Sequence, residues 1–230
     1  MSGPSAAEQR LFATTLSRHR HDHAYAAFVL EGGYVEAGDR GCWQVEAGDV
    51  VAHGMFEAHF NTVPRGGARV LNLPLDQAVR LPAVFRVADG DGLIHAARTD
   101  PHAVAAHLHP VEMRPRRVRD WPDLLAEALR RRPDLRIGVW AAEAGLATAT
   151  VSRGFTAAFG TSPARYRAEV RALRAWRRIR EGRDPLAAIA HDCGFADQAH
   201  LTRATRALTG ASPGFWRRVK SVQEVGPARP

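Results

Sequence analysis

The chain has 230 residues, of which 45% are hydrophobic and 24% are charged, and its formal net charge is +8. This composition excludes an intrinsically disordered protein, and the length suffices for one large domain or two small ones. The sequence contains no run of about 18 apolar residues that would span a bilayer, and its first residues lack the apolar core of a signal peptide. We therefore expect a cytoplasmic protein that does not enter a membrane.

The charge is divided unequally between the two halves of the chain. Residues 1–112 hold 9 Lys and Arg against 13 Asp and Glu, a net charge of −4, whereas residues 113–230 hold 23 against 11, a net charge of +12. A polyanionic partner is therefore predicted for the second half only. An isolated run of basic residues is more often a solvated surface, so this prediction needs support from a motif.

The first half of the chain has the pattern of short β-strands. Apolar stretches alternate with turn sequences such as Gly-Gly and Ala-Gly-Asp, at a spacing typical of a small barrel or sandwich. A helix is predicted over residues 100–108, where Ala103, Val104 and Leu108 form a candidate dimer seam. The predicted strands are 11–17, 26–30, 42–45, 50–52, 68–74 and 83–87.

The sequence becomes helical in its periodicity after residue 122. One helix is predicted over residues 163–182, because a proline begins the segment and a glycine ends it. We therefore expect the α+β class, with an all-β barrel followed by an all-α region. The predicted divisions are an all-β domain over 1–110, a linker over 111–121, a helical domain over 122–220 and a disordered tail over 221–230.

The helical half contains an internal repeat. The sequence VWAAEAGLATATVSRGFTAAFGTSPARY at residues 139–166 aligns with AIAHDCGFADQAHLTRATRALTGASPGFW at 188–216, so that Gly145 corresponds to Gly194. In each copy, a short helix ends at this glycine, which can adopt a positive φ, and a second helix follows a capping residue. This is the layout of a helix-turn-helix, whose second helix enters the major groove of DNA.

Residues 122–219 resemble the DNA-binding domain of the AraC/XylS family of bacterial transcription regulators, and the second copy carries that family's signature. The resemblance implies a tandem helix-turn-helix that binds double-stranded promoter DNA. It also implies that the protein most often activates transcription by contacting RNA polymerase. Family positions that contact DNA fall in the second copy on Gln198, Ala199, His200, Arg203 and Arg206.

Helix geometry also divides each recognition helix into two faces. In the second copy Leu201 and Leu208 are predicted to be buried, and in the first copy Val151, Phe155 and Phe159 are predicted core residues. The opposite faces carry the candidate DNA contacts, with an arginine in each copy that can bind guanine. These residues are Ala149, Thr150, Ser152 and Arg153 in the first copy, and Thr202 in addition to the five family positions in the second.

Three positions depart from the family pattern. Ala147 stands where a capping serine is usual, although Thr148 is an available substitute. Gly154 lies inside the first recognition helix, where glycine costs about 1 kcal/mol relative to alanine. Thr205 replaces a core phenylalanine, which predicts looser packing of the second copy.

The first half resembles the small cupin sensor domains that are often joined to this DNA-binding domain. The resemblance rests on HRHDH at residues 19–23 and GDVVAHGMFEAHFN at residues 48–61. If the first segment is a strand, His21 and His23 lie on one face, and with His59 they could bind one divalent metal such as Zn²⁺. The glutamate of metal-binding cupins is missing. The alternatives are a barrel that holds an organic effector and a plain surface cluster of histidines.

Two classes of function fit these features. The first is a sequence-specific transcription regulator, most simply an activator, whose N-terminal domain responds to a small effector, alone or as a homodimer. The alternative is a metal-dependent cupin enzyme, an isomerase or dioxygenase, with a basic tail that associates with DNA. The incomplete ligand set favours a non-enzyme. A third possibility is a regulator without a ligand, whose cupin serves only for dimerisation.

Overall fold

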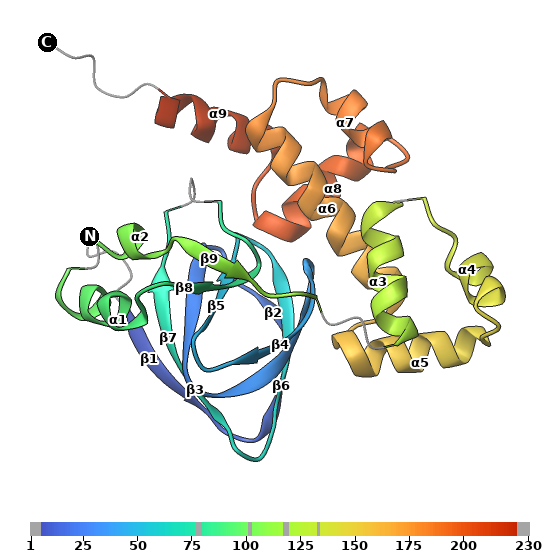
Figure 1. Ribbon diagram of the computed structural model, residues 1–230. Helices are drawn as coiled ribbons and strands as arrows, with labels where there is room; N and C mark the ends of the chain where they lie inside the picture. Colours follow the sequence, from blue (N-terminus) through green and yellow to red (C-terminus); the bar gives the residue numbers. More distant parts are fainter. Residues whose placement is uncertain (1–5, 77–79, 101–102, 117–119, 133, 225–230) are drawn as a thin grey trace, which may run out of the picture. The chain divides into compact units, whose positions relative to one another are not determined.

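The computed structural model describes residues 6–76, 80–100, 103–116, 120–132 and 134–224, with side chains up to residue 219. Contacts divide the chain into two compact units, residues 1–124 with 157–160 and residues 125–156 with 161–230. Strands dominate the first unit and helices the second (Figure 1), which confirms the predicted α+β class. Among the helices in these ranges, none is both long and apolar enough to cross a membrane.

The described part of the first unit holds nine strands in two antiparallel sheets that share one long strand. They are β1 (Ala7–Leu11), β2 (Thr14–Arg20), β3 (Tyr25–Gly38), β4 (Gly41–Glu46), β5 (Asp49–His53), β6 (Ala58–Val63), β7 (Ala68–Pro74), β8 (Val84–Val87) and β9 (Pro110–Met113). One sheet has the order β1-β7-β3-β5-β8-β9, and the other joins β2, β6, β3 and β4. Within the described residues, the strand pairs leave this barrel-like arrangement open. Strands β1, β6 and β9 were not predicted, and the strand expected over 11–17 overlaps mainly β2.

Strand β3 passes from one sheet to the other at Gly32 and Gly33, where the sequence predicts a turn. Its first part pairs with β5 and β7, and its second part pairs with β4 and β6. Gly32 has a φ of 69°, and a Cβ there would lie 2.2 Å from the carbonyl oxygen of Gly67. A Cβ at Gly33 would lie 2.3 Å from the carbonyl oxygen of Val45. The two glycines therefore permit neighbouring strands to approach closely.

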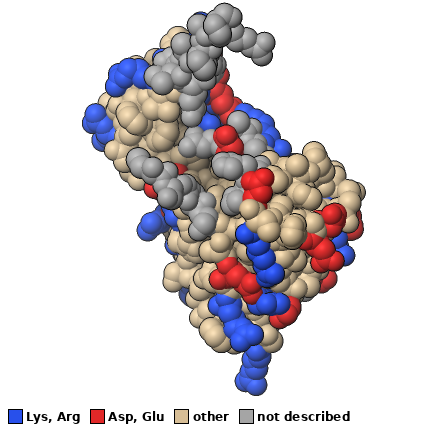
Figure 2. Space-filling model, turned by 90° about the vertical axis from the view of Figure 1, so that its left-hand side faces the viewer, with Lys and Arg blue, Asp and Glu red and all other residues tan. Residues whose placement is uncertain are grey.

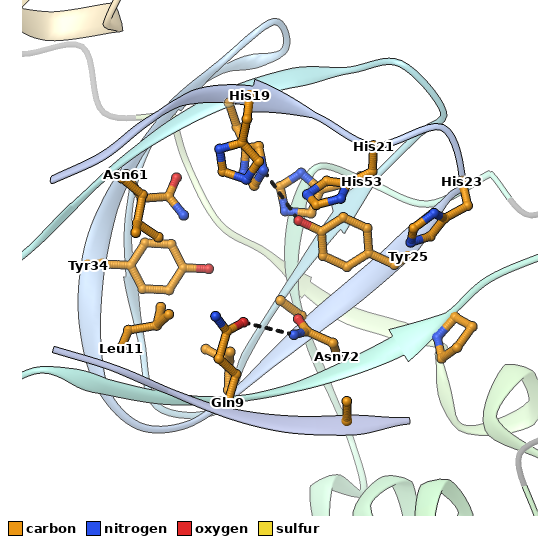
Figure 3. A pocket seen from close by; sticks show the side chains of 16 residues that line it. Gln9, Leu11, His19, His21, His23, Tyr25, Tyr34, His53, Asn61 and Asn72 are labelled. Carbon is orange, nitrogen blue, oxygen red and sulfur yellow. Dashed lines mark hydrogen bonds between the residues drawn. The ribbon is translucent and has the colours of Figure 1, made fainter. Parts of the chain in front are cut away.

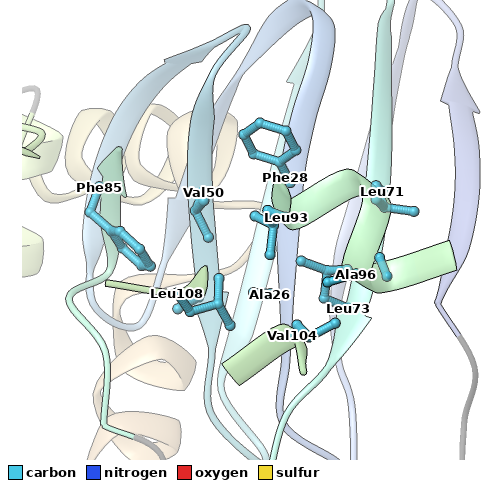
Figure 4. Close-up of a cluster of buried hydrophobic side chains, with 12 residues drawn as sticks. Ala26, Phe28, Val50, Leu71, Leu73, Phe85, Leu93, Ala96, Val104 and Leu108 are labelled. Atoms are coloured by element: carbon cyan, nitrogen blue, oxygen red, sulfur yellow. The ribbon is translucent and has the colours of Figure 1, made fainter. Parts of the chain in front are cut away.

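Two helices cover one face of the first sheet, α1 (Gly90–Thr99) and α2 (Val104–His107). The sequence did not predict α1, which begins at Asp89, whose carboxylate accepts a hydrogen bond from the backbone N–H of Gly92. Figure 4 shows their apolar side chains packed against strands of this sheet. Only part of the predicted helix over 100–108 is observed, and residues 101–102 lie outside the described ranges.

The structure corrects the predicted dimer seam. Val104 and Leu108 are each only 3% exposed and belong to the core beneath the two helices, and Ala103 packs against the same core. A residue whose apolar surface is already covered by its own domain has none left to bury against a second copy. The segment is therefore part of the hydrophobic core of the first unit.

The second unit contains seven helices in the described residues. They are α3 (Trp121–Arg131), α4 (Ile137–Glu143), α5 (Thr148–Phe159), α6 (Pro163–Glu181), α7 (Leu186–Asp192), α8 (Gln198–Thr209) and α9 (Pro213–Glu224). The predicted linker over 111–121 contains most of β9, and its residues 117–119 lie outside the description. Helix α9 extends into the predicted tail, and residues 225–230 are likewise not described.

The two turns of the repeat have the same backbone geometry. Gly145 has a φ of 67° and Gly194 a φ of 75°, both in the left-handed region. The N–H of Gly145 donates to the carbonyl of Ala142 at 3.0 Å, and that of Gly194 donates to the carbonyl of His191 at 3.0 Å. The repeat predicted from the sequence is therefore a repeat of three-dimensional structure, with two short helices ending at equivalent glycines.

Helix α6 connects the two copies as predicted. Its N-cap Ser162 accepts a hydrogen bond from the N–H of Arg165, and the helix ends at Gly182. With 19 residues it is about 28 Å long. Tyr166 near its beginning packs edge-to-face on Phe155, while Trp176 packs on Trp216.

The predicted core positions of both recognition helices are buried, namely Val151, Phe155, Phe159, Leu201 and Leu208. Thr205, which was expected to weaken the packing, is fully buried, and its hydroxyl donates to the carbonyl oxygen of Leu201 at 2.9 Å. The polar atom is thus satisfied within its own helix.

Candidate DNA interface and histidine pocket

The outer faces of α5 and α8 carry the residues predicted to contact DNA. Nine of the ten are exposed and Thr202 is half-buried, so each helix buries one face and presents the other to solvent. This arrangement is required of a recognition helix. The ten residues are Ala149, Thr150, Ser152, Arg153, Gln198, Ala199, His200, Thr202, Arg203 and Arg206.

The arginines on these two faces are available to a partner. Within the described part of the chain, the guanidinium groups of Arg153, Arg203 and Arg206 form no ion pair or hydrogen bond. Arg178 of α6 differs, because it donates to Asp184 at 2.7 Å and to Asp192 at 2.8 Å. A guanidinium with unused N–H donors can bind phosphate or the edge of a guanine base. A guanidinium that is already paired with carboxylates has fewer donors and less net charge available to such a ligand.

Helix α8 has a well-defined N-terminus, where a recognition helix approaches the bases. The Asp197 carboxylate accepts a hydrogen bond from the N–H of His200 at 2.6 Å, and the rings of Phe195 and His200 pack edge-to-face at 5.2 Å. Gly210, with a φ of 75°, ends the helix. These contacts hold the first turn of α8, which carries Gln198 and His200, in one orientation.

Figure 2 shows how charged side chains are distributed over one face of the molecule. There, basic and acidic side chains are interspersed, and those drawn in colour form no patch of a single sign. In the first unit, Arg69 forms ion pairs with Glu8 and Glu31.

The first unit contains a cavity of about 320 Å³ between its two sheets. This volume is close to the lower end of the range for small-molecule sites, roughly 300–1,000 Å³. Figure 3 shows histidines and Tyr25 along one wall, with Leu11 and Tyr34 opposite. The amides of Gln9 and Asn72 form a hydrogen bond of 3.3 Å, also drawn in Figure 3. The cavity therefore combines an apolar wall with groups that can bind polar atoms.

Strand register brings the cavity's ring side chains together. His19 of β2 is paired with His59 of β6, and Tyr25 of β3 is paired with His53 of β5. The ring centroids of His19 and His59 are 4.3 Å apart, as are those of His53 and His59. The Tyr25 ring stacks on His53 at 4.5 Å, and its hydroxyl lies 3.4 Å from Nε2 of His59.

Burial shifts the acid–base properties of these groups. It lowers the pKa of His53 to about 3 and, together with neighbouring histidines, that of His21 to about 4. It also raises the pKa of Tyr25 and Tyr34. Burial disfavours the charged form of Glu36 as well, but adjacent basic groups outweigh it and lower the pKa of this carboxyl. Near pH 7 the cavity therefore offers neutral imidazoles, which are metal ligands and hydrogen-bonding groups.

The structure brings together two groups that could hold a metal among the described residues. His21 and His59, two of the predicted ligands, join His19 in one group, and the second consists of Glu36, His53 and His59. The predicted ligand His23 belongs to neither group; it lies beyond the end of β2, and its Nδ1 is 3.0 Å from Oδ1 of Asp22.

Sequence reasoning missed the ligands contributed by other strands. Glu36 lies in the second part of β3, beyond the expected end of that strand, and His53 is the last residue of β5. Alternation along β3 would have indicated Glu36 once the strand was known to continue. Glu57, two residues before His59, belongs to neither group and accepts a hydrogen bond from the N–H of Gly54 at 2.8 Å.

Comparisons with known proteins agree with the helical geometry. Residues 140–219 match a family described as a helix-turn-helix domain. An AraC-like transcription regulator of Streptomyces antibioticus is 35% identical over 78 residues, which are 34% of this chain and 26% of that relative. The match thus spans about a quarter of the length of this curated relative.

Two solved structures cover different shares of the chain. The DNA-binding domain of AdpA, determined in complex with a target DNA, is 24% identical, covers 47% of this chain and 100% of its own, and has a TM-score of 0.43. ToxT from Vibrio cholerae, with a bound unsaturated fatty acid, is 10% identical, covers 93% of each chain and has a TM-score of 0.38. The helical region of this chain is therefore similar to a helix-turn-helix domain and to part of an AraC-like transcription regulator.

Proposed function

We propose that the protein regulates transcription by binding specific promoter DNA through α5 and α8. The observation that carries this proposal is the repeated helix-turn-helix, which places an exposed, unpaired arginine at the equivalent position of each recognition helix, Arg153 and Arg203. The net charge of +12 after residue 112 supplies the long-range attraction.

The two recognition helices are proposed to contribute unequally. In α8, Gln198, His200, Arg203 and Arg206 are long polar side chains on the exposed face, whereas in α5 only Arg153 has comparable reach. Arg203 can form two hydrogen bonds with guanine, and Gln198 can form two with adenine. We therefore expect most base discrimination to come from α8, with α5 adding affinity.

The first unit is proposed to hold a small effector in its cavity, by which the regulator is controlled. The support is the cavity of about 320 Å³ with polar and apolar walls. From the family resemblance, we further propose activation through contact with RNA polymerase. A homodimer is also part of the proposal, but its seam must lie elsewhere than at Val104 and Leu108, which are buried.

Fluorescence anisotropy with fragments of the DNA upstream of the coding sequence tests DNA binding. Binding should weaken steeply with salt, since Lys and Arg release counterions from the phosphates. The Arg203→Ala variant should lose roughly 5- to 150-fold in affinity for the preferred fragment and little for unrelated DNA, which corresponds to about 1–3 kcal/mol of base discrimination.

The matched control is Arg131→Ala, which removes the same charge from α3, where Arg131 pairs with Glu127. It should retain the preference between fragments. If the wild-type protein binds no upstream fragment at low salt, or if Arg203→Ala and Arg131→Ala behave alike, the proposed role of α8 is wrong.

A further inference from the structure

The cavity wall contains three buried polar groups whose facing atoms lack hydrogen bonds. Glu36, His53 and His59 are 4%, 5% and 4% exposed. Oε2 of Glu36, Nε2 of His53 and Nδ1 of His59 have no hydrogen-bond partner. Buried polar atoms are nearly always paired, so three unpaired atoms that face one another require an explanation, such as an ion between them.

The separations suit a shared ligand better than they suit direct hydrogen bonds. Oε2 of Glu36 lies 3.5 Å from Nε2 of His53 and 3.5 Å from Nδ1 of His59. The charge-assisted hydrogen bond of a histidine with a carboxylate is about 2.7–2.9 Å long. Two atoms bound to one tetrahedral metal, each about 2.1 Å from it, lie about 3.4 Å apart.

The chemistry of the three groups also suits a metal. One carboxylate and two imidazole nitrogens form a set that binds Zn²⁺ and other divalent transition metals. An imidazole presents a nitrogen lone pair to such an ion, and a carboxylate supplies a negatively charged oxygen. The second nitrogen of His59 lies 3.4 Å from the Tyr25 hydroxyl, a position from which ring orientation can be fixed.

We propose that Glu36, His53 and His59 bind one divalent transition metal ion at the edge of the cavity. His53 and His59 line the cavity and Glu36 is not among its lining residues, so the proposed ion lies within the wall of the cavity. This set shares only His59 with the group of His19, His21 and His59, in which His19 and His21 are half-buried. The proposal does not depend on DNA binding.

The test uses the full chain, freed of metal by a chelator and titrated with Co²⁺, whose visible absorption reports coordination, followed by competition with Zn²⁺. One Co²⁺ should bind per chain, with the strong absorption of a tetrahedral site. Glu36→Gln and His53→Asn should each weaken binding roughly tenfold or more. His21→Asn, which alters only the other group, is the matched control and should bind as the wild type does.

Circular dichroism of each metal-free variant establishes that it is folded, and Zn²⁺ should raise the melting temperature of the wild type and of His21→Asn only. If Glu36→Gln does not fold, His53→Asn decides the outcome. Absence of Co²⁺ binding by the wild type overturns the proposal, and so does a His21→Asn variant that loses binding while His53→Asn retains it. DNA binding by the same metal-free samples is measured separately, so failure of one proposal does not imply failure of the other.

Discussion

Replacing Gly145 by alanine should destabilise the helical unit, because the turn between α4 and α5 requires a left-handed residue. Gly145 has a φ of 67°, and a Cβ built there meets no atom within 4 Å. The substitution therefore causes no collision, and its cost is conformational only. For an L-residue in the left-handed region, that cost is roughly 1–2 kcal/mol.

Gly138 provides a matched control seven residues earlier. It is exposed, lies in the first turn of α4, and also has no atom within 4 Å of a built Cβ, but its φ is not positive. Gly138→Ala should therefore stabilise the unit by up to about 1 kcal/mol, the helix propensity difference between the two residues. The two variants make the same chemical change, and the sign of its effect depends on φ.

Thermal unfolding followed by far-ultraviolet circular dichroism measures the difference. For a domain of this size, 1 kcal/mol shifts the melting temperature by about 4–8 °C. Gly145→Ala should lower the melting temperature of the helical unit, and Gly138→Ala should leave it equal or higher. The melting temperature of Gly145→Asn should lie between those of the wild type and Gly145→Ala, because asparagine tolerates the left-handed region better than alanine does. Equal shifts of one sign for the two alanine variants would refute the reasoning.

Two further predictions concern stability and pH. Asp197→Ala should lower the urea midpoint of the helical unit by an amount equivalent to about 1 kcal/mol, because it removes the cap that accepts the N–H of His200, whereas Asp197→Asn should lose less. The first unit should lose stability as pH falls below about 6.5, because burial lowers the folded-state pKa of His53 to about 3, and the unfolded chain binds more protons between these values. For this group, the free energy of unfolding changes by up to about 1.4 kcal/mol per pH unit. Denaturation of the His53→Asn variant across this pH range should show a smaller change with pH. An unchanged dependence would contradict the role given to His53.

The two units also differ in whether their polar side chains without hydrogen-bond partners are exposed or buried. The exposed faces of α5 and α8 carry arginines whose side chains have no partner among the described residues, as the proposed DNA contacts require. In the first unit, by contrast, polar groups such as Glu36 are buried without complete hydrogen bonding. Interfaces with DNA form at exposed surfaces, while a small ligand is held by enclosure, and the positions of these groups match that difference.

The sequence alone determined the helical unit, because its signals are local. Gly145 and Gly194 mark equivalent turns, Ser162 and Gly182 bound α6, and apolar residues recur at the helical period, so each element could be predicted from neighbours within a few positions along the chain. The exposed faces of α5 and α8 follow from the same periodicity.

The cavity was decided by tertiary structure. His19 meets His59 through pairing of β2 with β6, and Glu36 joins them only because β3 continues through two glycines that the sequence alone presents as a turn. Strand partners lie tens of residues apart, and no local pattern specifies which strands pair or in what register. The metal-binding residues predicted from spacing along one segment therefore differ from the candidate groups that strand pairing brings together.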